Sequence, residues 1–179
     1  YAFIWGKLFQ FIYPDGVELI SSRGFESPIF KILMRISVLI SDAVFYHIPL
    51  QLLLNRIFER KNEKLKNIKI LIGLFIGIFS PCLVLIDNGH FQYNCVFIGL
   101  YILAYKFLLD KYLTLSIFFI SLSVNFKQMG AYYLLPFLFY ALRYLYKQSK
   151  NIFTFILSCL YCGIVTILSF AIVWSPFIY

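Results

Sequence analysis

The stretch from Asp87 to Asn94 holds residue types that could do chemistry in an apolar setting. It reads Asp-Asn-Gly-His-Phe-Gln-Tyr-Asn and lies between the apolar runs 68–86 and 95–109. Ionisable and amide groups are costly near hydrocarbon, so such a cluster indicates a functional site. Asp87 can accept a proton or a hydrogen bond from a sugar hydroxyl. His90 can donate a hydrogen bond to a phosphate or act as an acid or base. Gln92 and Asn94 can both donate to and accept from hydroxyls. The stretch therefore predicts a site for a polar ligand.

Two other interpretations of this stretch remain open. In the first, Asp87 or Asn88 caps one helix and Asn94 caps the next. We favour ligand binding because the stretch holds more polar groups than two caps need. The second is a metal site, but one histidine and one aspartate are too few ligands, so we expect no metal.

A second polar interruption runs from Asn125 to Met129 and contains Lys127 and Gln128. A lysine serves well as a point charge for phosphate, so we assign Asn125, Lys127 and Gln128 to the predicted site. Snorkelling of Lys127 to lipid headgroups is the alternative. Arg23 and Glu26 form a third polar pair and are assigned to the same site.

The composition indicates that membrane-spanning helices position these polar residues. The chain is 61% hydrophobic, with a mean hydropathy of +0.83. This apolar share is well above that of water-soluble domains. Several apolar runs approach the roughly 17–25 residues of a membrane helix. We predict an all-α polytopic membrane protein, with one membrane domain over 1–179, an amphipathic segment and loop over 1–27, and transmembrane helices over 28–179. The six predicted spans are residues 32–54, 68–86, 95–109, 112–124, 131–142 and 152–174.

Three local features refine this prediction. Ser80-Pro81 should kink or end the second span. The third and fourth spans are short for a full crossing, which is typical of helices that line a binding cavity. Arg35 and Asp42 are seven residues apart on one face of the first span, so we expect a buried or interfacial charge pair there that fixes helix packing.

The distribution of charge predicts the topology. The net charge of +8 would suit nucleic acid in a soluble domain, but here the basic residues concentrate in the short loops 55–69 and 143–151. The positive-inside rule makes these loops cytoplasmic, so we expect no nucleic-acid partner. Alternation then puts 1–27, 87–94 and 125–130 together on the opposite side of the membrane. A site at the non-cytoplasmic face follows.

Some chemistries find no support in the sequence. It contains no phosphate-binding loop, dinucleotide fingerprint or nucleophile elbow, and no cofactor is expected. Cys159 and Cys162 have redox-motif spacing but lie in the middle of an apolar run without a second pair. We interpret the cysteines as small apolar core residues.

Three ordered motifs resemble one enzyme family. The run 85–94, Leu-Ile-Asp-Asn-Gly-His-Phe-Gln-Tyr-Asn, resembles the dolichyl-phosphate-glucose-dependent α-1,3-glucosyltransferases of the endoplasmic reticulum. So do Ser-Arg-Gly-Phe-Glu-Ser at 22–27 with Met34-Arg35, and Asn-Phe-Lys-Gln-Met at 125–129 with Tyr132-Tyr133. One departure is Asn88, where the family usually has His. Within the family, Gly89 and the run 127–129 look like the enzyme that adds the first glucose.

The resemblance implies a part of a C-type glycosyltransferase fold in the endoplasmic reticulum membrane. It implies transfer of glucose from dolichyl-phosphate glucose to a dolichyl-pyrophosphate-linked, mannose-rich oligosaccharide, with inversion and with the site facing the lumen. Membrane lipid is then a further partner. The family's catalytic carboxylate lies in a luminal loop upstream of the matched part, so we expect the general base before Tyr1 and no activity from the piece alone.

Three other functions are kept as alternatives. The first is the paralogue that adds the second glucose. The second is a transporter, which should show a matched pair of interrupted helices in each half of the chain. The third is a non-catalytic membrane subunit, which has no need for two polar motifs on one face.

Overall fold

The computed structural model describes residues 1–18, 20–59 and 62–177. Over this part of the chain the secondary structure is helical throughout, which confirms the predicted all-α class. The α-helices are α1 (Ala2–Ile12), α2 (Pro28–Ser41), α3 (Ile48–Ile57), α4 (Glu63–Ile78), α5 (Asn94–Leu109), α6 (Leu113–Phe126), α7 (Leu134–Gln148) and α8 (Ile152–Trp174). Shorter 3-10 helices are η1 (Pro14–Gly16), η4 (Gln128–Tyr133) and η5 (Ser175–Phe177), and π-helices are η2 (Asp42–His47) and η3 (Leu83–Asn88).

The two π-helices fall inside the first two predicted spans. α2, η2 and α3 run on without a break from Pro28 to Ile57. The second span breaks after α4, at Phe79 and Ser80, and the helix resumes at Pro81, as the proline predicted. π-helical turns in α-helices are rare and often accompany functional sites. Here each of them carries one aspartate, Asp42 or Asp87.

The other predicted spans agree closely with the observed helices. α5 and α6 begin and end within two residues of their predictions, and α8 matches its prediction. α7 differs from its predicted bounds of 131–142. It begins at Leu134 because the 3-10 helix η4 occupies the preceding turns, and it continues to Gln148, so most of the predicted loop 143–151 is helical. By length and apolarity, α8 is the one helix of the described residues that qualifies as a membrane span.

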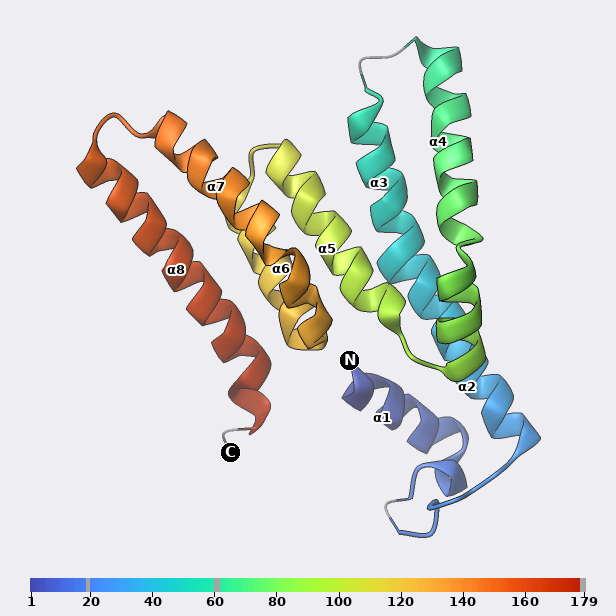
Figure 1. Cartoon of the computed structure of the whole chain (residues 1–179). Helices are drawn as coiled ribbons and strands as arrows, with labels where there is room; N and C mark the ends of the chain where they lie inside the picture. Colours follow the sequence, from blue (N-terminus) through green and yellow to red (C-terminus); the bar gives the residue numbers. More distant parts are fainter. Residues whose placement is uncertain (19, 60–61, 178–179) are drawn as a thin grey trace.

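The connections between the helices alternate between two ends of the molecule. Figure 1 shows the end of α3, the start of α4 and the α5–α6 and α7–α8 turns at one end, with the η3–α5 loop and η4 at the opposite end. Both termini lie at this second end as well. Arg60 and Lys61 of the predicted basic loop lie outside the described residues.

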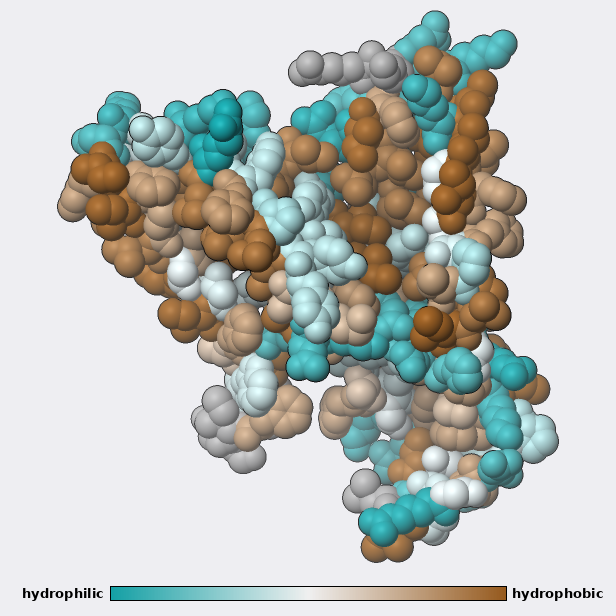
Figure 2. Space-filling view, in the orientation of Figure 1, coloured by the Kyte–Doolittle hydropathy of each residue, from teal (hydrophilic) through white to brown (hydrophobic). Residues whose placement is uncertain are grey.

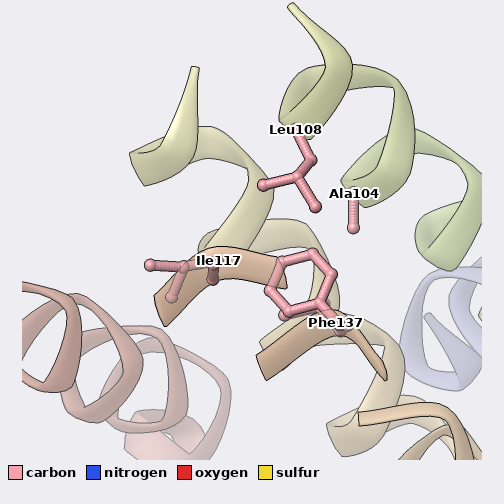
Figure 3. Packing of buried hydrophobic residues seen from close by; sticks show 6 residues of the cluster. Ala104, Leu108, Ile117 and Phe137 are labelled. Atoms are coloured by element: carbon pink, nitrogen blue, oxygen red, sulfur yellow. The ribbon is translucent and has the colours of Figure 1, made fainter. Parts of the chain in front are cut away.

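Two packed regions hold the helices together. Ala104, Leu108, Ile117 and Phe137 join α5, α6 and α7 (Figure 3), with Ile120 and Ala141 completing the cluster. A second cluster of Tyr46, Leu83, Cys95 and Val96 joins η2, η3 and α5. α5 is common to both clusters, so it forms the centre of the molecule.

The sides of the bundle are apolar. Figure 2 shows hydrophobic residues over these sides, with hydrophilic residues at the upper end and in a second band across the lower part. The exposed large side chains include Leu71, Phe75, Ile164 and Ile167, each more than half exposed. Water-soluble monomers rarely expose apolar surface on this scale.

Two ion pairs, which we call the ionic clamp, join α3 to the α5–α6 turn at the end of the bundle that carries the basic stretches. Arg56 at the end of α3 pairs with Asp110 in the α5–α6 turn, and the Lys106 ammonium lies 2.8 Å from the same carboxylate. Burial by itself would raise the pKa of Asp110, but the hydrogen bonds from Lys106 and Arg56 outweigh it and hold this pKa below the ordinary value. Because the folded pKa is lowered, the clamp stabilises the fold above the unfolded-state pKa and is lost as the pH falls through the folded value.

Candidate functional site

A hydrogen-bonded chain of side chains links the two polar motifs. Lys127, just after α6, donates to the Asn94 side-chain oxygen. The Asn94 amide in turn donates to Asp87 Oδ1 at 2.7 Å. The sequence predicted that these three residues belong to one site, and the structure brings them together from the α6–η4 connection, the first residue of α5 and η3.

Asp87 is the buried anchor of this chain. Its side chain is fully buried, and Oδ2 accepts from the backbone N–H of Cys95 at 2.6 Å. Both oxygens therefore have donors, and the carboxylate caps the first turn of α5 from outside the helix. A negative charge is favourable at a helix N-terminus. The capping interpretation thus describes Asp87 itself, whereas its predicted contact with a ligand stays a prediction.

Lys127 is the cation of the site. Its side chain is partly buried, and its ammonium lies 6.0 Å from the centroid of the Phe97 ring. In the part of the chain that the structure describes, no carboxylate lies within ion-pair distance of this ammonium. Its side-chain hydrogen bond goes to the neutral amide of Asn94. The charge is therefore left for an anion, and a lysine ammonium suits a phosphate group.

The loop between η3 and α5 is held in a strained conformation. Phe91 and Tyr93 both have left-handed backbone angles, with φ of 59° and 48°. Bulky residues rarely adopt this region, and such strain is concentrated at functional sites. The Tyr93 hydroxyl lies 2.6 Å from the Ser37 hydroxyl, and its ring packs edge-on against Tyr1 at 5.3 Å between centroids. These contacts to α2 and to the N-terminus hold the loop in place.

The remaining predicted residues surround this chain or lie apart from it. Gln92 is exposed, and its side-chain oxygen lies 3.5 Å from the Asn94 amide. His90 and Gln128 are exposed at the same end of the molecule. Asn125 instead binds the end of α8, because its oxygen accepts from the Trp174 indole at 2.9 Å.

Arg23 and Glu26 are not drawn into the hydrogen-bonded chain. Both side chains are exposed in the loop before α2. Glu26 forms an ion pair with Lys31 at 3.1 Å, and among the described residues no ion pair joins it to Arg23. Their assignment to the site stays a prediction.

Asp42 belongs to the site, although the sequence assigned it to a different partner. Its carboxylate, that of Asp87 and the Cys95 thiol bring oxygen and sulfur atoms within 4.8 Å of one another. Asp42 accepts from the Asn88 amide at 3.1 Å. The predicted pair with Arg35 is wrong, because Arg35 is exposed whereas Asp42 is buried against η3 and α5. An acid within an apolar run was the signal that could have identified it.

The cluster of Asp42, Asp87 and Cys95 has the donor atoms of a possible metal site. Asp87, however, already accepts from two donors, and three ligand residues are one fewer than a closed tetrahedral zinc site takes. The site is better described as a buried polar network with a cation at one end.

Comparison of the sequence with known proteins finds glycosyltransferases among its relatives. The ALG6, ALG8 glycosyltransferase family matches residues 1–179. A Dictyostelium discoideum protein named as a probable dolichyl pyrophosphate Man9GlcNAc2 alpha-1,3-glucosyltransferase is 39% identical over 99% of this chain and 34% of its own length. The Saccharomyces cerevisiae protein named as that glucosyltransferase is 35% identical over 98% of this chain and 32% of its own length. The chain spans about a third of the length of these relatives.

Proposed function

Because the chain belongs to the ALG6, ALG8 glycosyltransferase family, we propose that it forms part of an α-1,3-glucosyltransferase of N-glycan precursor assembly. The reaction moves glucose from dolichyl-phosphate glucose to a dolichyl-pyrophosphate-linked, mannose-rich oligosaccharide. The relatives' names, which specify Man9GlcNAc2, favour the first glucose over the second. The three sequence motifs and the helical architecture support the same proposal.

The observation that carries the proposal is the cation Lys127 at the end of the Asn94–Asp87 chain. A polyprenyl-phosphate donor brings one anionic phosphate to the edge of the membrane. An ammonium that no carboxylate neutralises among the described residues stabilises that phosphate and the charge that it gains as the leaving group. His90, Gln92 and Gln128, exposed around Lys127, are our candidates for contacts with sugar hydroxyls.

The full-length enzyme that contains this chain provides the test of the function. Membranes containing it are supplied with radiolabelled dolichyl-phosphate glucose and with the Man9GlcNAc2 acceptor on dolichyl pyrophosphate. We expect a product larger by one glucose. A matched reaction uses the same acceptor already carrying one glucose; preference for that acceptor would identify the second-glucose paralogue, and no transfer to either would contradict the proposal.

We further propose six membrane helices, with the site facing the lumen of the endoplasmic reticulum. The apolar sides of the bundle and the alternation of the connections in Figure 1 support this arrangement. The basic residues gather in the stretches 55–69 and 143–151, which cover the end of α3, the start of α4 and the end of α7. The positive-inside rule then puts these stretches on the cytoplasmic side.

Labelling of single cysteines tests this topology. We expect a cysteine at position 62 to react from the cytoplasmic side of sealed microsomes, and one at position 88 to react only after the lumen is opened to the reagent. A cysteine at position 128 should react in the same way as one at position 88. It repeats the measurement at an exposed residue outside the buried network. Modification of 62 and 128 from the same side would rule out the arrangement.

A further inference from the structure

Two adjoining cavities lie between α6, α7 and α8. The first has a volume of about 470 Å³ and is lined mainly by apolar side chains, such as Leu138 and Phe170. The second has a volume of about 460 Å³. Leu145 and Cys162 line both cavities, so the two spaces share part of their walls. Volumes of roughly 300–1,000 Å³ are typical of ligand sites.

The second cavity brings polar side chains of three helices together. Thr114 comes from the start of α6, Gln148 from the end of α7 and Tyr161 from α8. The Thr114 and Tyr161 hydroxyls lie 3.1 Å apart. The α5–α6 and α7–α8 turns lie at this end of the molecule (Figure 1). The first cavity instead extends along α7 to Leu134, the first residue of that helix. A ligand that fills both spaces is therefore an amphiphile whose polar group lies at the end with the basic stretches.

Uncompensated positive charge lies close to the second cavity. Lys147 and Lys150 flank Gln148 along the chain, and both lysines are exposed. Among the described residues, neither of them forms an ion pair. The sequence has no aspartate or glutamate from residue 111 to residue 179, and Asp110 is already held in the ionic clamp. The charge at this end therefore favours a ligand with an anionic group.

An anionic phospholipid fits this arrangement better than the polyprenyl-phosphate donor does. The proposed function places the donor's phosphate at Lys127, at the opposite end of α6 from Thr114. The hydrocarbon chain of the donor has no polar group for the second cavity. A phospholipid brings a phosphate for the polar cavity and acyl chains for the apolar one. Basic pockets between membrane helices on the cytoplasmic side are suited to anionic headgroups.

We propose that the two cavities bind one anionic phospholipid of the cytoplasmic leaflet. Its phosphate accepts hydrogen bonds from Thr114, Gln148 and Tyr161. The ammonium groups of Lys147 and Lys150 lie near its charge, and one acyl chain fills the apolar cavity. The bound lipid occupies the space between the three helices and so holds α8 against α6 and α7. The choice of leaflet rests on the proposed topology, but the binding itself does not rest on glucosyl transfer.

Photolabelling of the full-length enzyme tests this site. The purified protein in detergent is exposed to phosphatidylserine that carries a diazirine in one acyl chain, and the labelled peptides are identified by mass spectrometry. We expect labels on α6, α7 and α8, with weaker labelling by the matching phosphatidylcholine. Unlabelled phosphatidylserine should compete with the probe, and an equal amount of dolichyl phosphate should not.

Two pairs of lysine substitutions separate this site from a general attraction to positive charge. Lys147→Gln with Lys150→Gln should weaken labelling by phosphatidylserine roughly five-fold for each lysine, the usual contribution of one cation near an anionic membrane surface. Lys64→Gln with Lys66→Gln removes two cations from α4, at the same end of the molecule. All residues of α4 are described and none of them lines either cavity, so this pair should leave labelling unchanged.

A glycine substitution tests the apolar cavity. Gly163 lines this cavity, and a Cβ placed on it meets no atom within 4 Å. The side chain of Gly163→Leu can therefore enter the cavity without displacing the protein. Labelling should fall roughly five-fold or more, the loss expected when extra atoms enter an occupied space. Gly6→Leu on α1 is the matched control, because a Cβ at Gly6 also meets open space, and it should leave labelling unchanged.

Several results would overturn the proposal. Wild-type labels that avoid α6, α7 and α8 would show that another segment of the full-length protein covers the cavities. Stronger competition by dolichyl phosphate than by phosphatidylserine would assign the apolar cavity to a polyprenyl chain. Labelling that is unchanged in Gly163→Leu, or equal for the two phospholipids, would show only nonspecific contact with lipid. These measurements do not use glucose transfer, so a lack of transfer with labelling intact would contradict the proposed function alone.

Discussion

Replacing Lys127 with methionine in the full-length enzyme should lower glucosyl transfer roughly 100-fold, the usual loss when one charged donor to a reacting oxyanion is removed. The ammonium is the cation of the candidate site, it donates a hydrogen bond to the Asn94 amide oxygen, and no carboxylate of the described residues neutralises it. Methionine keeps the length of the side chain without its charge. Initial rates of transfer from radiolabelled donor, with yield and thermal stability measured in parallel, report the effect.

Two further lysine variants define what the loss means. Lys127→Arg keeps the charge and should recover part of the activity. Lys111→Met removes an exposed cation from the α5–α6 turn, at the other end of the bundle, and should leave transfer unchanged. Wild-type donor affinity and turnover in Lys127→Met would refute the phosphate-binding role and favour snorkelling of Lys127 to the lipid headgroups.

Gly99→Ala should prevent the full-length protein from folding. Gly99 lies on α5, and a Cβ placed on it would overlap the backbone carbonyl of Phe45 and lie 3.2 Å from the backbone N of Tyr46. The obstacle is the backbone of η2, which cannot move aside as a flexible side chain can. Overpacking in a well-packed interior costs about 1–3 kcal/mol, and displacing a backbone segment should reach or exceed the upper end. Detergent-solubilised yield and the melting temperature measure the effect.

Gly163→Ala is the matched control for this prediction. Gly163 lies within α8, and a Cβ placed on it meets no atom within 4 Å. Its replacement should leave yield and melting temperature nearly unchanged. Normal folding of Gly99→Ala would show that α5 and η2 do not pack as closely as described, and it would remove the contact that brings Cys95 beside Asp42.

The order of the helices, and the bounds of several of them, could be predicted from the sequence alone. Apolar runs bounded by polar or basic residues predicted α5, α6 and α8 nearly to the residue, because hydropathy and length are local properties. The break before Pro81 followed from the missing N–H and the ring of proline. The start of α7 was missed, because a 3-10 helix and an α-helix carry nearly the same local pattern of apolar residues.

The sequence also predicted two of the segments that form the candidate site, but not how their side chains pair. The two polar motifs, and Lys127 as the cation, were visible because such groups are costly in apolar runs. Only the tertiary structure decided that Asp87 caps α5, that Asn125 binds Trp174, and that Asp42 meets Asn88 and not Arg35. These pairings depend on the two π-helices, which shift the register of side chains along a helix, and on the close approach of α5 to η2 at Gly99. Spacing along one ideal helix cannot reveal contacts that are made between helices.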